Sequence, residues 1–183
     1  MRFFGCALAA VALLSCDGAQ IDSNQRCAVA NFKTLTVAET DFRENDRDGD
    51  KDANFWVKDL SGLWGLQAGG EPLRLIDRHT AKADRTPGRG AYVGHADEPP
   101  NCGYFFGALK RYRQDGKAID YDDGKGRNAS RFGFVAWPER LLRRGMLTYI
   151  VSERGAIYSK DTGGKPVEEF PEDPAKEGWK RED

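Results

Sequence analysis

The sequence predicts a loop-rich α+β domain in which one long N-terminal helix packs on an antiparallel β-sheet. The helix is indicated by apolar residues that recur every three or four positions in residues 24–44, with no Gly or Pro between them. The sheet is indicated by alternating apolar residues in residues 131–160, where short turns separate three strand-like segments. The 21 glycines predict long loops, and the aromatic content of 11 % argues against disorder.

The first residues of the chain resemble a bacterial lipoprotein signal. Arg2 supplies a positive charge, and the apolar run over residues 3–14 is shorter than the roughly 20 residues that a membrane-spanning helix needs. Cys16 completes Leu-Leu-Ser-Cys, which resembles the lipobox, where the thiol receives diacylglycerol and the chain is cut before the cysteine. An ordinary signal peptide with an incidental cysteine is the alternative. The predicted organisation is a signal peptide over residues 1–15, a tether over residues 16–22 and a single domain over residues 23–183.

Lipidation at Cys16 predicts an exported protein held on a membrane of the bacterial cell envelope, because several acyl chains together bind a bilayer firmly. The charges of the chain nearly cancel, with 28 Lys and Arg against 29 Asp and Glu. No basic surface for nucleic acid is therefore expected.

Two of the four cysteines remain for a disulfide. Cys6 would be removed with the signal and Cys16 would carry lipid, which leaves Cys27 and Cys102. Disulfides persist outside the cytoplasm, and closing a loop of about 75 residues stabilises a fold by up to about 4 kcal/mol. We predict that this pair is bonded; two small buried thiols that never meet are the alternative.

The predicted helix begins after Ser23, a suitable N-cap, and runs over residues 24–44. Its apolar face, which is expected to cover the sheet, consists of Ala28, Phe32, Leu35, Ala38 and Phe42. On the solvent face, Glu39 and Arg43 have the spacing of an i, i+4 ion pair.

Directly after the helix, four aspartates alternate along residues 45–54 and an asparagine follows them. Oxygens at this spacing can turn toward one hard cation, and Gly49 lets the chain double back. An EF-hand does not fit, because its bidentate glutamate position would hold Phe55; the pattern is closer to the D-x-D-G-D loops of extracellular calcium-binding repeats. The predicted calcium ligands are Asp46, Asp48, Asp50, Asp52 and Asn54. The alternative is a solvated acidic turn that Arg47 and Lys51 neutralise.

The remaining segments carry weaker signals. The sequence predicts a short helix within residues 71–84, a buried strand over residues 103–109 and a long hairpin connection over residues 114–130. The proline-rich C-terminal tail is expected to lack regular structure and to wrap the domain, with Phe170 and Trp179 as apolar plugs.

Several short segments carry a resemblance to known families: NDRDG at 45–49, FW at 55–56, DLSGL at 59–63, GYFF at 103–106, FGFVAWP at 132–138, LTYIV at 147–151 and YSKD at 158–161. Over about residues 27–179 the chain resembles the pilin-like secreted proteins of planctomycete-type bacteria and the bacterial domain-of-unknown-function family numbered 2950. The resemblance implies a pilin-like α+β domain, and a calcium loop by analogy with the major pseudopilin of type II secretion. Pilins carry a long apolar helix after a prepilin peptidase site, where this chain has a short signal and Cys16.

These observations predict a lipid-anchored envelope protein whose pilin-like domain is a non-enzymatic assembly or interaction module. Calcium is its expected ion, and envelope or secretion-system proteins are its expected partners. The alternative is an extracytoplasmic module that binds a glycan or peptide in a groove lined by Trp and Tyr, which exposed aromatic side chains on one sheet face would favour. An enzyme is not expected, because the sequence contains no G-x-S-x-G, no H-E-x-x-H and no dinucleotide fingerprint.

Overall fold

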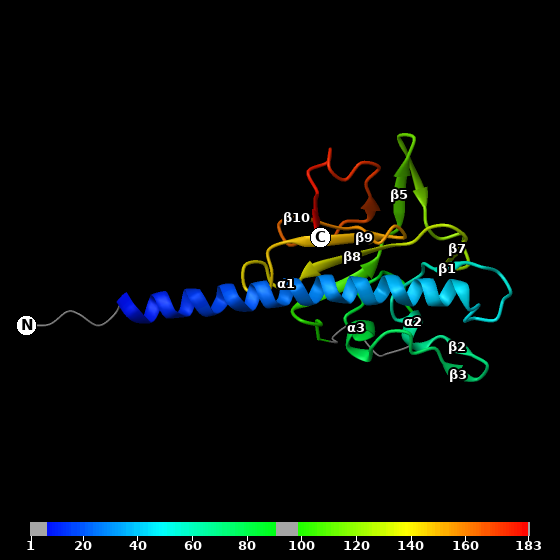
Figure 1. Cartoon of the computed structure of the whole chain (residues 1–183), viewed down its shortest axis with the longest axis horizontal. Helices are drawn as coiled ribbons and strands as arrows, with labels where there is room; N and C mark the ends of the chain where they lie inside the picture. The colour runs from blue at the N-terminus through cyan, green and yellow to red at the C-terminus, as the bar shows by residue number, and fades with distance from the viewer. Residues whose placement is uncertain (1–6, 91–98, 183) are drawn as a thin grey trace, which may run out of the picture.

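The computed structural model describes residues 7–90 and 99–182 of the chain. One long helix, α1 (Ala7–Glu44), lies along a five-stranded antiparallel sheet, so the predicted α+β class is confirmed (Figure 1). The strand order in this sheet is β12, β10, β9, β8, β4. Its strands are β4 (Tyr104–Ala108), β8 (Gly133–Pro138), β9 (Thr148–Ser152), β10 (Ile157–Lys160) and β12 (Lys180–Glu182).

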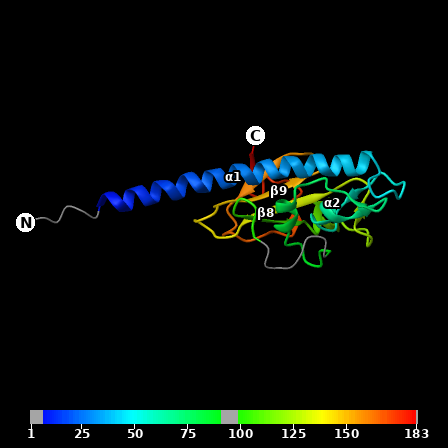
Figure 2. The same ribbon diagram turned by 90° about the horizontal axis from the view of Figure 1, so that it is seen from below.

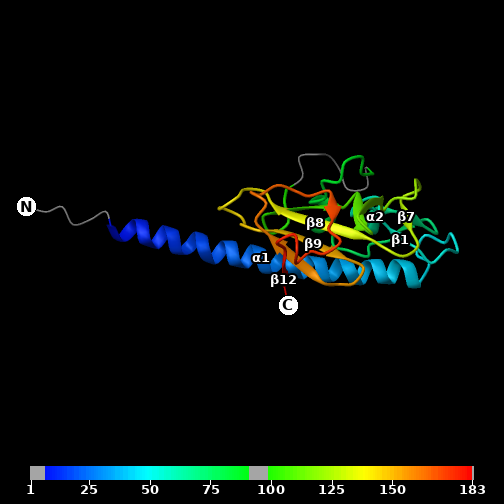
Figure 3. The same ribbon diagram turned by 90° about the horizontal axis from the view of Figure 1, so that it is seen from above.

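Helix α1 is longer than the sequence pattern predicts. It contains 38 residues, which at 1.5 Å per residue gives a length of about 57 Å. It continues through residues 16–22, so the predicted tether is helical and Ser23 lies inside the helix instead of capping it. Gly18 lowers the stability of this part of the helix by only about 1 kcal/mol relative to Ala. The C-terminal half of α1 is held by packing, so residues 16–22 can extend an existing helix without a new nucleation step. The N-terminal part projects beyond the domain (Figure 1, Figure 2 and Figure 3).

The predicted apolar face of α1 is buried, and it consists of Ala28, Phe32, Leu35, Ala38 and Phe42. Glu39, in contrast, is not on the solvent face. Its side chain is fully buried, and Oε2 accepts a hydrogen bond from the Trp56 backbone N–H at 3.0 Å. Arg43 donates to the Ala53 carbonyl oxygen at 3.3 Å. The predicted Glu39–Arg43 pair is wrong because the chain folds back along this side of α1, which residue spacing within the helix does not reveal.

The three strands predicted within residues 131–160 are present as β8, β9 and β10, and β9 pairs antiparallel with both neighbours. The turn between β9 and β10 is closed by the Gly155 N–H, which donates to the Ser152 carbonyl oxygen at 2.9 Å. Gly155 has a φ of 72°, a conformation that favours glycine. The buried strand predicted over residues 103–109 is β4, which pairs with β8.

Within the described residues, three smaller sheets and two short helices complete the fold. β1 (Phe55–Trp56) pairs with β7 (Arg127–Asn128), and β2 (Gln67–Ala68) pairs with β3 (Glu71–Pro72). β5 (Arg111–Gln114) lies between β6 (Lys117–Asp120) and β11 (Glu169–Phe170). The helices are α2 (Gly62–Gly65) and α3 (Arg78–Lys82).

Two local predictions need correction. Within residues 71–84 only α3 is helical, because the Asp77 side chain caps two backbone N–H groups and starts the helix there. The connection predicted over residues 114–130 contains β6, because Asp115 and Gly116 form a tight turn with positive φ at both residues.

The C-terminal tail is more ordered than the sequence pattern predicts, since it contains β11 and β12. It nevertheless covers the domain with apolar side chains. Trp179 is 7 % exposed, and Phe170 lies edge-on to Tyr158 with 6.2 Å between the ring centroids.

A disulfide joins Cys27 on α1 to Cys102, two residues before the start of β4, as predicted. The two residues are 75 positions apart in the sequence and their Cα atoms are 6.2 Å apart. Close to it, the Asn24 side-chain amide donates to the Arg144 carbonyl oxygen at 2.8 Å. These contacts fix α1 to the loops beside β4 and β9.

The predicted signal peptide is described only in part, because residues 1–6 lie outside the described residues. Cys16 falls within α1. In the described ranges, no helix combines the length and the apolar character needed to cross a membrane.

Candidate functional site

The acidic loop, residues 45–54, follows the C-terminus of α1. Asp46, Asp48 and Asp50 each place one carboxylate oxygen within 4.8 Å of the others. Gly49, with a φ of 73°, turns the chain between them. The structure therefore brings together three of the five side chains that the sequence predicts as ligands, and we refer to these three as the aspartate triad.

Asp48 is the buried member of the triad. Its side chain is 7 % exposed, and its Oδ2 lies 2.6 Å from Nη2 of Arg127 on β7. The Arg127 guanidinium lies 4.2 Å from the centroid of the Trp56 ring, which holds it in place. Among the described residues, the other oxygen of Asp48, Oδ1, is buried and has no hydrogen-bond partner. A buried carboxylate oxygen without a donor is unfavourable unless a cation or a water satisfies it.

Asp50 connects the triad to the residues that follow. It accepts hydrogen bonds from the Asp52 backbone N–H at 2.8 Å and from the Asn54 side-chain amide at 3.2 Å. The Asp52 N–H holds the pKa of Asp50 below its ordinary value, so Asp50 is ionised at neutral pH. The Asn54 side-chain oxygen is buried and lacks a partner within the described ranges. The Asp52 carboxylate does not belong to the triad.

The two cations expected to neutralise this loop do not pair with the triad. Arg47 pairs with Asp41 on α1, with 2.8 Å between Nε and Oδ2. Among the residues that the structure describes, the contact of Lys51 with Asp46 is through the Lys51 backbone N–H, at 3.0 Å. The cation that does contact the triad is Arg127, which is 79 positions from Asp48 and which no local pattern indicates. Three converging carboxylates, one of them paired with a guanidinium, form an oxygen-rich, negatively charged group of the kind that hard divalent cations bind.

Two further carboxylates, Asp59 and Asp84, are fully buried. Asp84 accepts hydrogen bonds from three backbone N–H groups and from the Thr86 hydroxyl. Asp59 accepts from the Trp56 indole N–H at 3.2 Å and from the Gly62 N–H at 2.7 Å. Protein donors occupy these oxygens, so both groups hold loops together.

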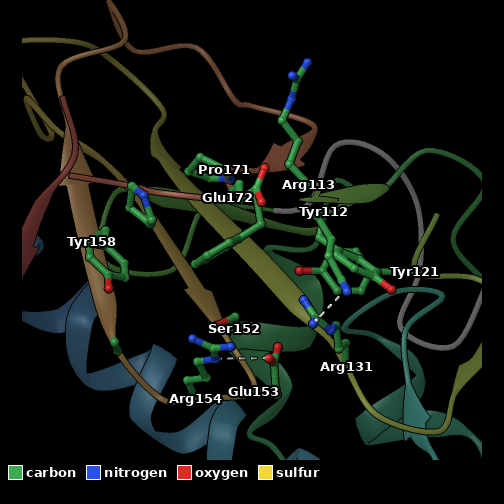
Figure 4. A pocket seen from close by; sticks show the side chains of 14 residues that line it. Tyr112, Arg113, Tyr121, Arg131, Ser152, Glu153, Arg154, Tyr158, Pro171 and Glu172 are labelled. Atoms are coloured by element: carbon green, nitrogen blue, oxygen red, sulfur yellow. Dashed lines mark hydrogen bonds and ion pairs between the residues drawn. The ribbon is translucent and has the colours of Figure 1, made fainter. Parts of the chain in front are cut away.

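A cleft of about 310 Å³ opens between β5, the β9–β10 turn and the C-terminal tail (Figure 4). Its volume lies at the lower end of the range of small-molecule sites. Tyr112 and Tyr121 form one aromatic pair, with centroids 5.0 Å apart, and Tyr158 and Phe170 form another. Figure 4 shows Tyr158 across the cleft from Tyr112 and Tyr121.

Charged side chains of both signs reach this cleft. Arg131 lies 4.4 Å from the centroid of the Tyr112 ring and donates to the Gln114 side-chain oxygen at 3.0 Å. Glu153, whose side chain is 19 % exposed, lies 3.8 Å from Arg154. The Glu153–Arg154 ion pair is drawn as a dashed line in Figure 4. The cleft combines flat aromatic surface with hydrogen-bond donors and acceptors, as polar small-molecule sites do.

The cleft matches the predicted aromatic groove only in part, because tyrosines line it and tryptophans do not. Trp56 and Trp179 are buried in the core. Tyr112 lies on β5, Tyr121 directly follows β6, and Tyr158 lies on β10. No local pattern in the sequence brings them together.

The sequence matches the protein family described as "Protein of unknown function (DUF2950)" over residues 17–177. The chain belongs to the DUF2950 family. No curated protein and no solved structure matches it. The DUF2950 match includes the acidic loop and all residues that line the cleft, and it begins at the residue after Cys16.

Proposed function

We propose that this DUF2950 protein is a lipid-anchored bacterial envelope protein with a pilin-like domain that serves assembly or interaction and not catalysis. The observation that carries the proposal is the continuous helix α1. Its C-terminal part is buried in the domain (Figure 1), and residues 18–20, which remain ahead of that part after a cut before Cys16, are exposed. A helix in this arrangement on an antiparallel sheet is what the pilin-like resemblance implies.

Lipid on Cys16 would leave a short, stiff spacer between membrane and domain. Ile21 is buried, whereas residues 18–20 are exposed. The helical rise from Cys16 to Ile21 amounts to about 8 Å. The domain would therefore lie close to the membrane surface, within reach of envelope or secretion-system proteins.

Calcium is proposed as a structural ion of the acidic loop. Three converging carboxylates support this role, and one of them has a buried oxygen without a hydrogen-bond partner among the described residues. The ion would bind the segment that connects α1 to β1, where Asp48 already contacts β7 through Arg127. Its effect would be to stabilise the junction between the long helix and the sheet.

Metabolic labelling tests the anchor. Bacteria that express the wild type, Cys16→Ala or Cys6→Ala are given labelled palmitate, and each protein is partitioned between detergent and water. We expect the wild type and Cys6→Ala to be labelled and to enter the detergent phase, whereas Cys16→Ala stays unlabelled. Palmitate label that persists in Cys16→Ala, or a wild type without label, would refute the lipid anchor.

A second candidate function is an extracytoplasmic binding module, and the cleft is the observation that favours it. Its half-buried aromatic side chains and its mixed charges are suited to a small polar ligand. This function is compatible with a lipid anchor, which would display the cleft outside the cytoplasm.

A further inference from the structure

We propose that the cleft in Figure 4 binds a short neutral glycan, with a sugar ring stacked on Tyr158 and sugar hydroxyls bonded to Tyr121 and to the charged side chains around it. The inference rests on the second candidate function, the extracytoplasmic binding module, and names its ligand class. It does not depend on the lipid anchor.

The aromatic side chains provide the apolar part of the recognition. Tyr112, Tyr158 and Phe170 are half-buried at the cleft, so they offer ring surface while their other atoms stay packed. The C–H faces of a sugar ring are apolar. Stacking on an aromatic face removes both apolar surfaces from water and leaves no polar group buried without a hydrogen bond. Tyr158 stands across the cleft from the other two tyrosines, so a ligand between them can contact aromatic surface on both sides (Figure 4).

Two nearly buried hydroxyls provide polar contacts. Tyr121 and Ser152 are 1 % and 5 % exposed and both line the cleft. In the described part of the chain, neither side-chain hydroxyl has a hydrogen-bond partner, although the Tyr121 carbonyl oxygen accepts from the Asn128 amide. Burial, together with the nearby Glu153 charge, raises the pKa of Tyr121, so its hydroxyl stays protonated and can both donate and accept. Such hydroxyls are placed to pair with the hydroxyls of a ligand.

The charges favour a neutral ligand over an anion. The charged residues lining the cleft are Arg113, Arg131, Arg154, Glu153 and Glu172. Arg113 already pairs with Glu169, and Arg131 already bonds to Gln114. The carboxylates are engaged as well, because Glu172 accepts from the Asp115 and Gly116 N–H groups and Glu153 lies beside Arg154. An anion would have to approach these two carboxylates, whereas a sugar hydroxyl can donate to a remaining lone pair of a carboxylate or accept from a remaining N–H of an arginine.

An extended peptide is less suited to this cleft. Peptides that bind by strand addition need a free strand edge. Of the strands that line the cleft, β5, β9 and β10 are already paired on both sides. β11 is an edge strand but contains only 2 residues, so it offers few backbone hydrogen bonds to an added strand. A peptide would have to rely mainly on side-chain contacts.

A glycan array followed by calorimetry tests the proposal. The full-length chain, purified in a detergent without a sugar headgroup, is applied to an array of neutral and acidic glycans, and the best neutral glycan is titrated in solution. We expect saturable binding, weakened about tenfold by Tyr121→Phe through the lost hydrogen bond and by at least as much in Tyr158→Ala. Tyr149 is a buried residue of β9 that does not line the cleft. Tyr149→Phe removes its hydroxyl and is expected to keep wild-type affinity.

Three results would overturn the proposal: no saturable binding of any neutral glycan, binding confined to acidic glycans or to a peptide library, or unchanged affinity in both cleft variants. Thermal unfolding of each variant shows that it is folded. Cys16→Ala is included because it separates the two proposals. This variant should bind the glycan as the wild type does. A negative result in the lipid-labelling experiment would therefore not affect the glycan proposal, and a negative result in the glycan experiment would not affect the lipid-anchor proposal.

Discussion

The carboxylate of Asp48 and the guanidinium of Arg127 form an ion pair, with 2.6 Å between Oδ2 and Nη2 and both side chains largely buried. Asp48 lies in the loop after α1 and Arg127 lies on β7, 79 positions further along the chain. The guanidinium also stacks on the Trp56 ring of β1. The acidic loop is therefore fixed to the sheet and is part of the folded domain.

Removal of Arg127 is expected to destabilise the protein strongly. Arg127→Ala leaves the Asp48 carboxylate buried without its cation, which should lower the free energy of unfolding by about 3 kcal/mol. Arg47→Ala is the matched control, because it removes an exposed pair with Asp41 and should cost less than about 1 kcal/mol. Urea denaturation measures both variants. Equal losses would show that the Asp48–Arg127 pair contributes no more than a surface contact.

Calcium is expected to raise the melting temperature. An ion bound only by the folded state adds about 2.7 kcal/mol at 100-fold excess over its dissociation constant, which corresponds to several degrees. Magnesium should do less, because it demands tighter octahedral geometry. Asp50→Asn should remove the response, whereas Asp52→Asn should keep it, because the Asp52 carboxylate lies outside the triad. The measurement is calorimetry in chelator and in millimolar calcium; identical melting temperatures without a heat of binding would leave the loop as an acidic turn.

Glu39 is expected to make stability fall with rising pH. Burial raises the pKa of Glu39 well above its ordinary value of 4.5. Above pH 4.5 and up to the raised pKa, the folded chain keeps a proton that the unfolded chain releases, so the contribution of Glu39 to the free energy of unfolding decreases through this window. Glu39→Gln keeps an acceptor for the Trp56 N–H and removes the titration.

Urea unfolding of the wild type and Glu39→Gln over a series of pH values checks this expectation. The variant should be more stable than the wild type at neutral pH, and the difference should shrink toward acid. Parallel curves would contradict a buried, proton-binding Glu39.

Loss of the disulfide is expected to lower the free energy of unfolding by up to about 4 kcal/mol, because the bond restricts a long loop in the unfolded chain. Cys27→Ser, Cys102→Ser and the double variant should lose similar amounts, since each breaks the same bond. Reductant should bring the wild type to the same stability and leave the double variant unchanged. A wild type that reductant does not affect, measured by urea unfolding, would mean that the bond is absent in solution.

The sequence predicts best the features whose signals are local. The apolar face of α1, from Ala28 to Phe42, follows from helical spacing, and β8 to β10 follow from alternation between turns. The Cys27–Cys102 pair follows from counting the cysteines that remain once Cys6 and Cys16 are assigned to a predicted lipoprotein signal. The spacing of Asp46, Asp48 and Asp50 likewise indicates their convergence.

Features that depend on distant segments are not predictable in this way. Glu39 has the spacing of a solvent-facing residue, yet the Trp56 N–H of a later strand meets it in the interior. Arg127 reaches Asp48 only after β7 pairs with β1. The cleft needs the C-terminal tail to fold back beside β5, as β11 does, before Phe170 can meet Tyr158.

We propose that lipid on Cys16 holds the domain on an envelope membrane, and intact-mass spectrometry of the protein extracted from bacterial membranes measures whether that lipid is present. We expect a chain that begins at Cys16 and carries the added mass of diacylglycerol and an N-linked acyl group, and we expect this species to be absent for Cys16→Ala. An unmodified chain that retains residues 1–15, or one that begins at another residue and carries no lipid, would contradict the claim.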